Sequence, residues 1–219
     1  MPRFLLPVPV DHRARRFAQL AAGLALYGAT AGMIVLAQLG LDPWDVLHQG
    51  LARTVGLRIG TWVIIISVAV LLLWIPLNQR PGIGTLANAL VVGAVMNLFL
   101  TLAHPPHELW ARVLLLAGGV GGNGVATGLY IGAGLGPGPR DGLSVGIAGQ
   151  GHSMRVVRTS IEATVLVTGL ILGGTVGVGT LAYALLIGPI THVTIPALAI
   201  TQVRERSSHD SAIRPSAPR

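Results

Sequence analysis

The chain has 219 residues, of which 52% are hydrophobic and only 11% carry a charged side chain. Soluble domains are typically about 25% charged, so this composition indicates a membrane protein. The absence of cysteine excludes disulfides, thiolate metal sites and cysteine-based catalysis. The formal net charge is +7, and every basic residue is an arginine. Because the arginines gather at helix ends and tails, we assign this charge to membrane topology rather than to nucleic-acid binding.

Six apolar stretches are long enough to cross a bilayer, which takes about 20 mostly apolar residues. In chain order they cover residues 17–39, 60–77, 84–103, 110–133, 156–173 and 179–200. Their recurrence along the chain argues against a cleaved signal peptide. Two further segments, 45–56 and 141–151, are too short and too polar to span, and we expect each to be a re-entrant or interfacial helix. The sequence therefore predicts an all-α, polytopic membrane helix bundle.

The distribution of arginine tests this arrangement, because cytoplasmic loops are enriched in positive charge. With a cytoplasmic N-terminus and six crossings, twelve arginines lie inside and three, Arg53, Arg58 and Arg112, lie outside. This bias predicts that both termini are cytoplasmic. We expect a basic N-terminal segment at 1–16 and a disordered polar tail at 204–219.

The chain contains an internal duplication. A shift of 96 residues overlays Pro43 and Asp45 on Pro139 and Asp141, and a shift of 95 overlays GIGTLANALVVG, from residue 82, on GVGTLAYALLIG, from residue 177. We expect two repeats, 17–103 and 104–203, each with three spans. An odd number of spans inverts the second repeat, which is an architecture of secondary transporters. If the short helices also spanned, each repeat would have four crossings and the repeats would be parallel.

The segments DPWD and GPRD begin the two short helices. In the first, Asp42 is the predicted N-cap, and Pro43 and Trp44 lead to the acid Asp45. In the second, Asp141 occupies the place of Asp45, and acid is favourable at both helix starts. Two interpretations stay open. Either the acids only cap helices, or they also face a shared cavity where a carboxylate binds a cation, a proton or an amine-bearing substrate.

Polar residues inside the spans are further candidates. Glu162 is the clear acid within a span, although Arg158, one turn earlier, could simply form an ion pair with it. His192 and Asn97 are repeat mates that we expect on a helix–helix face, where His192 either titrates or forms a packing hydrogen bond. The predicted substrate or ion site comprises Asp45, Asp141, Glu162, Asn88 and His192.

Two GxGT motifs each precede a span. Their residues are Gly82, Gly84 and Thr85 in the first repeat, and Gly177, Gly179 and Thr180 in the second. We favour tight turns between packed helices, the alternative being an anion site made of backbone N–H groups. Small residues at four-residue spacing, such as Gly28/Gly32 and Gly124/Gly128, predict close helix packing.

Two stretches, PWDVLHQGLARTVGLRIGTW and WIPLNQRPGIGTLANALVVG, resemble the YczE branch of the YczE/YyaS/YitT membrane proteins. The matching positions are Pro43, Trp44, Asp45, Gly50, Gly60, Pro81, Gly82, Gly84 and Thr85. The resemblance implies a polytopic protein of the bacterial cytoplasmic membrane and implies no reaction. The second repeat departs from the pattern, with Gly138 and Arg140 near the place of Trp44 and Val176 in place of Pro81. Any site is therefore expected to be asymmetric.

No catalytic constellation is recognised, because HExxH is missing and the histidines are scattered. We expect neither an enzyme nor a cofactor or metal site. The predicted function is transport of a small molecule or ion. The expected partners are the lipid bilayer, that solute and, in a homo-oligomer, further copies of the chain; we expect no nucleic acid. The alternative is a non-transporting scaffold or accessory subunit for a membrane enzyme or signalling protein. Transport requires a polar cavity lined from both repeats, whereas a scaffold requires a dry core.

Overall fold

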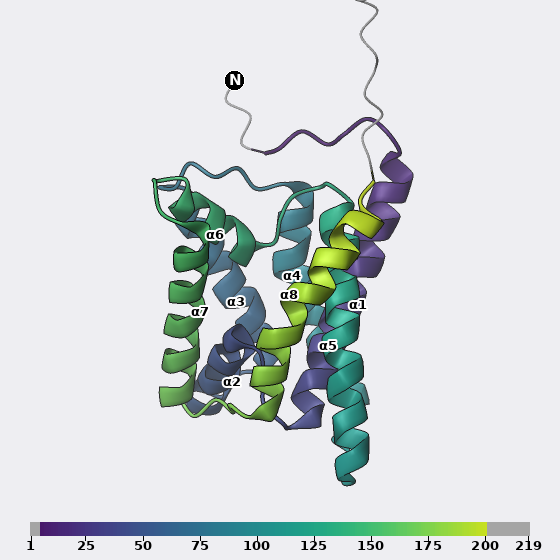
Figure 1. Cartoon of the computed structure of the whole chain (residues 1–219), viewed down its shortest axis with the longest axis vertical. Helices are drawn as coiled ribbons and strands as arrows, with labels where there is room; N and C mark the ends of the chain where they lie inside the picture. Colours follow the sequence, from purple (N-terminus) through teal and green to yellow (C-terminus); the bar gives the residue numbers. More distant parts are fainter. Residues whose placement is uncertain (1–4, 201–219) are drawn as a thin grey trace, which may run out of the picture.

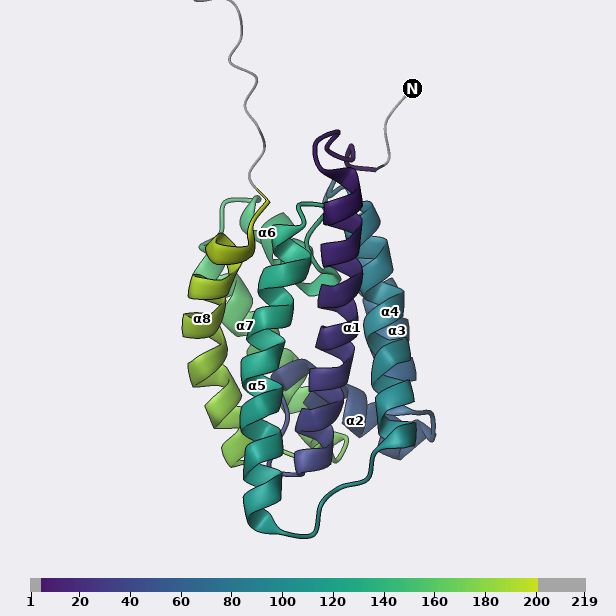
Figure 2. The same ribbon diagram turned by 90° about the vertical axis from the view of Figure 1, so that its right-hand side faces the viewer.

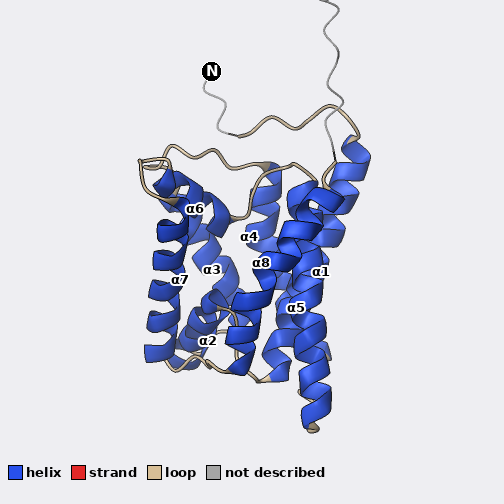
Figure 3. Cartoon of the chain, viewed as in Figure 1, coloured by secondary structure: helices blue, strands red, loops and turns tan. Residues whose placement is uncertain are grey.

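Helices account for all regular structure over residues 5–200, the part of the chain that this computed structural model describes (Figure 3). In chain order they are α1 (Arg13–Ala37), α2 (Pro43–Val55), α3 (Ile59–Leu73), α4 (Ile83–Leu102), α5 (Leu109–Gly132), α6 (Pro139–Ala148), α7 (Met154–Ile171) and α8 (Val178–Leu198). The predicted all-α bundle is confirmed, and α2 and α6 are the two short helices. The tail predicted at 204–219 lies outside the described residues.

Four helices, α1, α4, α5 and α8, are long and apolar enough to cross a membrane. A fifth crossing results if α2 and α3, which are bent by 114° at their junction, form one broken span. Six spans were predicted, but the helices in the other two stretches, 60–77 and 156–173, are not long and apolar enough to cross by themselves. Helix α3 has only 15 residues, about 22 Å of helix against a hydrocarbon core of about 30 Å. Helix α7 has 18 residues but carries Arg155, Arg158 and Glu162.

Corresponding helices of the two halves run in opposite directions (Figures 1 and 2). Helix α1 leads away from the end of the bundle that holds the N-terminus, and α5, which packs along α1, leads back toward it (Figure 2). Helix α2 lies at the far end of the bundle, whereas α6 lies at the N-terminal end (Figure 1). An inverted repeat requires this arrangement.

Arg16 and Arg112 occupy equivalent positions of the two halves, and each donates hydrogen bonds to the C-terminal end of the other half's long helix. Arg112, at the start of α5, donates hydrogen bonds to the carbonyls of Ala37 and Gln38 at the end of α1. Arg16, near the start of α1, donates to the carbonyl of Ala133 at the end of α5. The last carbonyls of a helix have no partner within the helix, so these contacts satisfy part of each C-terminus.

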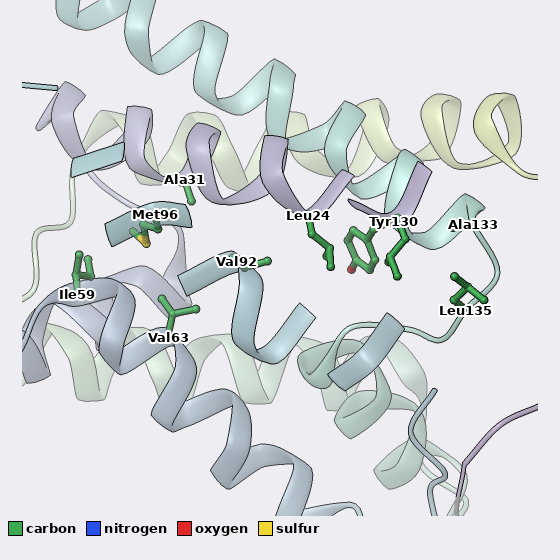
Figure 4. Close-up of a cluster of buried hydrophobic side chains, with 10 residues drawn as sticks. Leu24, Ala31, Ile59, Val63, Val92, Met96, Tyr130, Ala133 and Leu135 are labelled. Carbon is green, nitrogen blue, oxygen red and sulfur yellow. The ribbon is translucent and has the colours of Figure 1, made fainter. Parts of the chain in front are cut away.

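The main apolar core lies between α1, α3, α4 and α5 (Figure 4). Its buried residues are Leu20, Leu24, Ala31, Ile59, Val63, Val92, Met96, Tyr130, Ala133 and Leu135. Small residues allow the helices to approach. A Cβ atom at Gly28 would lie 2.6 Å from the carbonyl oxygen of Val92, and one at Gly124 would meet the side chain of Ile190. The close packing predicted from the glycine spacing is thus confirmed for α1 on α4 and for α5 on α8.

Candidate functional site

A polar cavity of about 310 Å³ lies between the two halves of the bundle. This volume is at the lower end of the range for small-molecule sites, about 300–1,000 Å³. Every helix of the described chain contributes to its lining. The polar and aromatic lining residues are Tyr27, Asp42, Trp44, Ser67, Asn88, Thr127, Tyr130, Arg140, Asp141, Ser144, Arg158, Glu162, Tyr183 and Thr191.

The start of α2 forms one wall of the cavity. Asp42 is the N-cap, and its Oδ1 accepts hydrogen bonds from the backbone N–H groups of Trp44, at 3.0 Å, and Asp45, at 3.2 Å. Pro43 is the first helical residue, where its missing N–H costs nothing. The predicted cap is confirmed in each of these positions. Asp42 also lines the cavity, a role that the sequence analysis did not assign to it.

The start of α6 forms the opposite wall. Its N-cap Gly138 has φ −64° and ψ 158°, the same angles as Asp42, so the two helices begin alike. Pro139 again occupies the first helical position, and its carbonyl accepts a hydrogen bond of 3.1 Å from the indole of Trp74, the C-cap of α3. Asp141 stands in the first turn and lines the cavity.

Arg140 joins the two helix starts. Its guanidinium lies 3.5 Å from Asp42 Oδ1 and 3.8 Å from Asp45 Oδ1. It also lies over the ring of Trp44, 5.1 Å from the ring centroid. Both aspartates are almost fully buried, and buried carboxylates need a compensating cation or several hydrogen bonds. Arg140 supplies that cation from the other half of the molecule.

Asp45 does not line the cavity. Its side chain is buried, and its Oδ1 lies 2.9 Å from Nδ1 of His48, one turn further along α2. His48 is equally buried, and its Nε2 has no hydrogen-bond partner within residues 5–200. Asp45 therefore lies behind the cavity wall, where its carboxylate contacts His48 and Arg140. The hypothesis that Asp45 and Asp141 face one cavity is met only by Asp141.

Asp141 carries the free carboxylate of the cavity. Its Oδ2 accepts a hydrogen bond of 2.9 Å from the Tyr130 hydroxyl on α5. Over residues 5–200 no arginine or histidine nitrogen lies within 4.0 Å of this carboxylate. Asn88, another predicted site residue, lines the same cavity from α4. Asp141 thus lines the cavity without a direct ion pair within residues 5–200.

The exposed residues that line the cavity, Arg158, Ala184 and Gly188, all lie on α7 and α8, so we place its opening between these two helices. The ion pair predicted for Arg158 and Glu162 on α7 is present at 3.1 Å, with the two side chains 62% and 43% exposed. Both residues line the cavity, facing residues of α8 that include Tyr183 and Ala184. Glu162 is therefore neutralised locally and stands at the mouth of the cavity rather than deep inside it.

His192 lies away from the site. It is exposed on α8 and does not line the cavity. Its repeat mate Asn97 does lie between helices, where it accepts a hydrogen bond from the Gly60 N–H and donates one to the Thr61 hydroxyl. The shared helix–helix face expected for this pair is thus found only for Asn97, because α7 does not pack against α8 as α3 packs against α4.

Both GxGT motifs form tight turns against the other half. The Thr85 hydroxyl accepts a hydrogen bond from the Gly82 N–H, and the Gly84 N–H donates to the carbonyl of Leu135. In the second motif Thr180 bonds Gly177 in the same way, and Gly179 donates to the carbonyl of Leu39. The four glycine amides thus donate to threonine hydroxyls or to protein carbonyls, which favours the turn over the anion site.

Sequence reasoning missed Arg140 and three tyrosines as site residues. Tyr27 and Tyr130 meet edge to face, with ring centroids 6.0 Å apart, and the Tyr183 hydroxyl donates to Asn123 at 3.0 Å. Arg140 could have been found from the repeat, because it takes the place of Trp44 in the second copy. Over residues 5–200 no three histidine or acidic residues gather closely enough to hold a metal ion.

Comparison with known proteins gives a family and three relatives. The profile of a family described as "Family of unknown function (DUF6198)" matches residues 14–196. An uncharacterized protein of Haemophilus influenzae is 40% identical over 181 residues, covering 82% of this chain and 83% of the relative.

Two relatives come from Bacillus subtilis. The uncharacterized membrane protein YczE is 34% identical over 179 residues, covering 76% of this chain and 83% of YczE. The uncharacterized protein YyaS is 28% identical over 181 residues, covering 80% of this chain and 89% of YyaS. The resemblance to this group expected from the sequence motifs is confirmed. No solved structure was found to match the chain.

Proposed function

The chain belongs to the DUF6198 family, a family of unknown function, and we propose that it is a transporter of a small solute or ion. In this proposal two inverted repeats form one bundle in the bacterial cytoplasmic membrane, with both termini inside. The protein moves its substrate without making or breaking covalent bonds. The arginine distribution supports the proposed orientation.

The observation that carries the proposal is the charged cavity between the halves. Asp42 and Asp141 enter it from two helix starts that belong to different halves, and Arg140 connects them. Inverted-repeat transporters bind substrate between repeats, at broken helices in matching positions. Charge held within a membrane bundle is costly and is usually retained for function. A scaffold with a dry core would not need such buried charges.

The two helix seams beside the cavity differ, which supports alternating access. Gly60 and Gly93 bring the backbones of α3 and α4 into contact, so that a Cβ atom on either would clash with the carbonyl of the other. Their repeat mates are Arg155 and Gly188, and a Cβ at Gly188 would meet nothing within 4 Å. The α7–α8 seam is therefore open while the α3–α4 seam is closed. Rocking of one repeat against the other would exchange these states.

The proposal can be tested without knowing the substrate, because a transporter must expose its cavity to each side of the membrane in turn. The chain has no cysteine, so a single introduced thiol reports without background. Ala184 on α8 lines the cavity. The neighbouring Leu185 is 73% exposed and does not line the cavity, so it serves as a control at the same depth.

Ala184→Cys and Leu185→Cys would be treated with a membrane-impermeant thiosulfonate from either side of oriented vesicles. We expect Ala184→Cys to react from both sides, since water reaches the cavity alternately, and Leu185→Cys to react from neither. Reaction of Ala184→Cys from one side only, or from neither side, would contradict transport and favour the scaffold.

A further inference from the structure

More carboxylates than guanidinium groups line the cavity. Asp42, Asp141 and Glu162 line it, against the guanidinium groups of Arg140 and Arg158. Asp45 adds a further carboxylate behind the wall, 3.8 Å from Arg140. Arg140 is thus shared by two aspartates and Arg158 is paired with Glu162. An anionic ligand would find neither guanidinium group free, and it would face a surplus of negative charge.

Among these carboxylates, Asp141 is the one that a ligand in the cavity can contact most directly. Its Oδ2 accepts the Tyr130 hydroxyl, while its Oδ1 has no hydrogen-bond partner within residues 5–200. Asp141 also lies in the first turn of α6, where the positive end of the helix dipole favours a carboxylate. A cationic donor group could therefore form a short, charge-assisted hydrogen bond with Asp141.

The walls around Asp141 suit an organic cation better than an inorganic one. Tyr27 and Tyr130 present aromatic rings, which attract ammonium groups. Ile161 and Ile187 add apolar surface beside the opening between α7 and α8. A calcium ion takes six to eight oxygen ligands, yet no cluster of three acidic or histidine side chains exists in the described chain.

We infer that the cavity binds an organic cation, an ammonium group on a small apolar body, with Asp141 as its counterion. The ammonium group sits between Asp141 and the tyrosine pair, and the apolar body points toward the isoleucines at the opening. This inference rests on the proposed function only in naming the same cavity as the substrate site, since binding can be measured without transport.

Three small ligands of one shape provide the test: benzylamine, which is cationic at neutral pH, benzyl alcohol and benzoate. Binding to the full-length protein in detergent would be measured by calorimetry, with empty micelles subtracted. We expect benzylamine to bind at least ten-fold more tightly than benzyl alcohol and benzoate to bind most weakly. Asp141→Asn should remove the preference for benzylamine, and Asp141→Glu should keep it within a few-fold. Glu108→Gln, which alters an exposed carboxylate outside the cavity, should behave as the unmodified protein.

Three results would overturn the inference: equal or tighter binding of benzyl alcohol or benzoate, a benzylamine preference that survives in Asp141→Asn, or no benzylamine binding by a folded preparation. Thermal unfolding of each variant shows whether it is folded. The cysteine experiment decides transport separately. Asp141-dependent amine binding without two-sided labelling would refute transport alone, and two-sided labelling without amine preference would refute only the substrate class.

Discussion

Arg140 lies over the indole ring of Trp44, with its guanidinium carbon 5.1 Å from the ring centroid, and the two residues occupy equivalent positions of the two sequence repeats. One position of the repeat is therefore an aromatic ring in the first half and a cation in the second, and the two stack where the halves meet. A symmetric pair of tryptophans would leave Asp42 and Asp45 without a cation. The departure from the repeat is what makes the buried acids tolerable.

Replacing Arg140 by glutamine should destabilise the protein. The Arg140 side chain is only 24% exposed, and its loss leaves two buried carboxylates without a cation. Breaking a buried ion pair costs about 3–5 kcal/mol, and the long distances here suggest about 3 kcal/mol. The apparent Tm in detergent should fall clearly, and Arg140→Lys should retain part of the stability. Arg155→Gln, at an exposed arginine, is the control. An equal Tm for both glutamine variants would show that Arg140 does not hold the helix starts together.

The matched glycines Gly93 and Gly188 should respond oppositely to alanine. A Cβ at Gly93 would meet the backbone of Gly60, so Gly93→Ala must separate α3 from α4 at a cost of about 1–3 kcal/mol. A Cβ at Gly188 meets nothing within 4 Å. The helix-propensity gain there is offset by the following Pro189, which crowds a preceding Cβ, so Gly188→Ala should change stability by less than about 0.5 kcal/mol. Thermal unfolding of the two variants in one detergent checks this, and similar losses would mean that both seams are closed.

Much of the fold follows from local signals in the sequence. Asp42 and Pro43 mark the start of α2 because a capping side chain and a proline at the first helical position act over three or four residues. The apolar stretches likewise indicate α1, α4, α5 and α8, since length and hydropathy together decide whether a helix can span.

The site was less predictable because it depends on how distant helices meet. Asp45 was expected in the cavity, yet the rotation of α2 turns it toward His48 and leaves Asp42 on the cavity side. His192 was expected between helices, but α7 and α8 do not pack closely in this structure, and a Cβ at Gly188 would meet nothing within 4 Å. Such outcomes are set by long-range packing, which a single sequence pattern does not contain.

The stability contributed by Asp11 should depend on pH. Arg16, which is 1% exposed, donates a 2.6 Å hydrogen bond to the Asp11 carboxylate, and this bond lowers the pKa of Asp11 below its usual value. A carboxyl group whose pKa is lower in the folded state stabilises the protein above its unfolded pKa, about 3.9, and loses that effect as pH falls through the folded value. Asp11→Asn should therefore lower the apparent Tm at pH 7, with the difference from the unmodified protein shrinking below about pH 4. A difference that stays constant from pH 7 to pH 3 would rule out the ion pair as its cause.

Residues Val55 and Arg155 should lie on opposite sides of the membrane. Val55 ends α2 and is 60% exposed, while Arg155 is exposed at the start of α7, at the other end of the bundle (Figure 1). In intact cells, an impermeant maleimide should label Val55→Cys directly and Arg155→Cys only after the cells are permeabilised, because the arginine-rich side is expected to be cytoplasmic. The reverse pattern would keep the inverted repeats but flip their orientation. Labelling of both variants from one side would refute the inverted arrangement, because parallel repeats place corresponding loops on the same face.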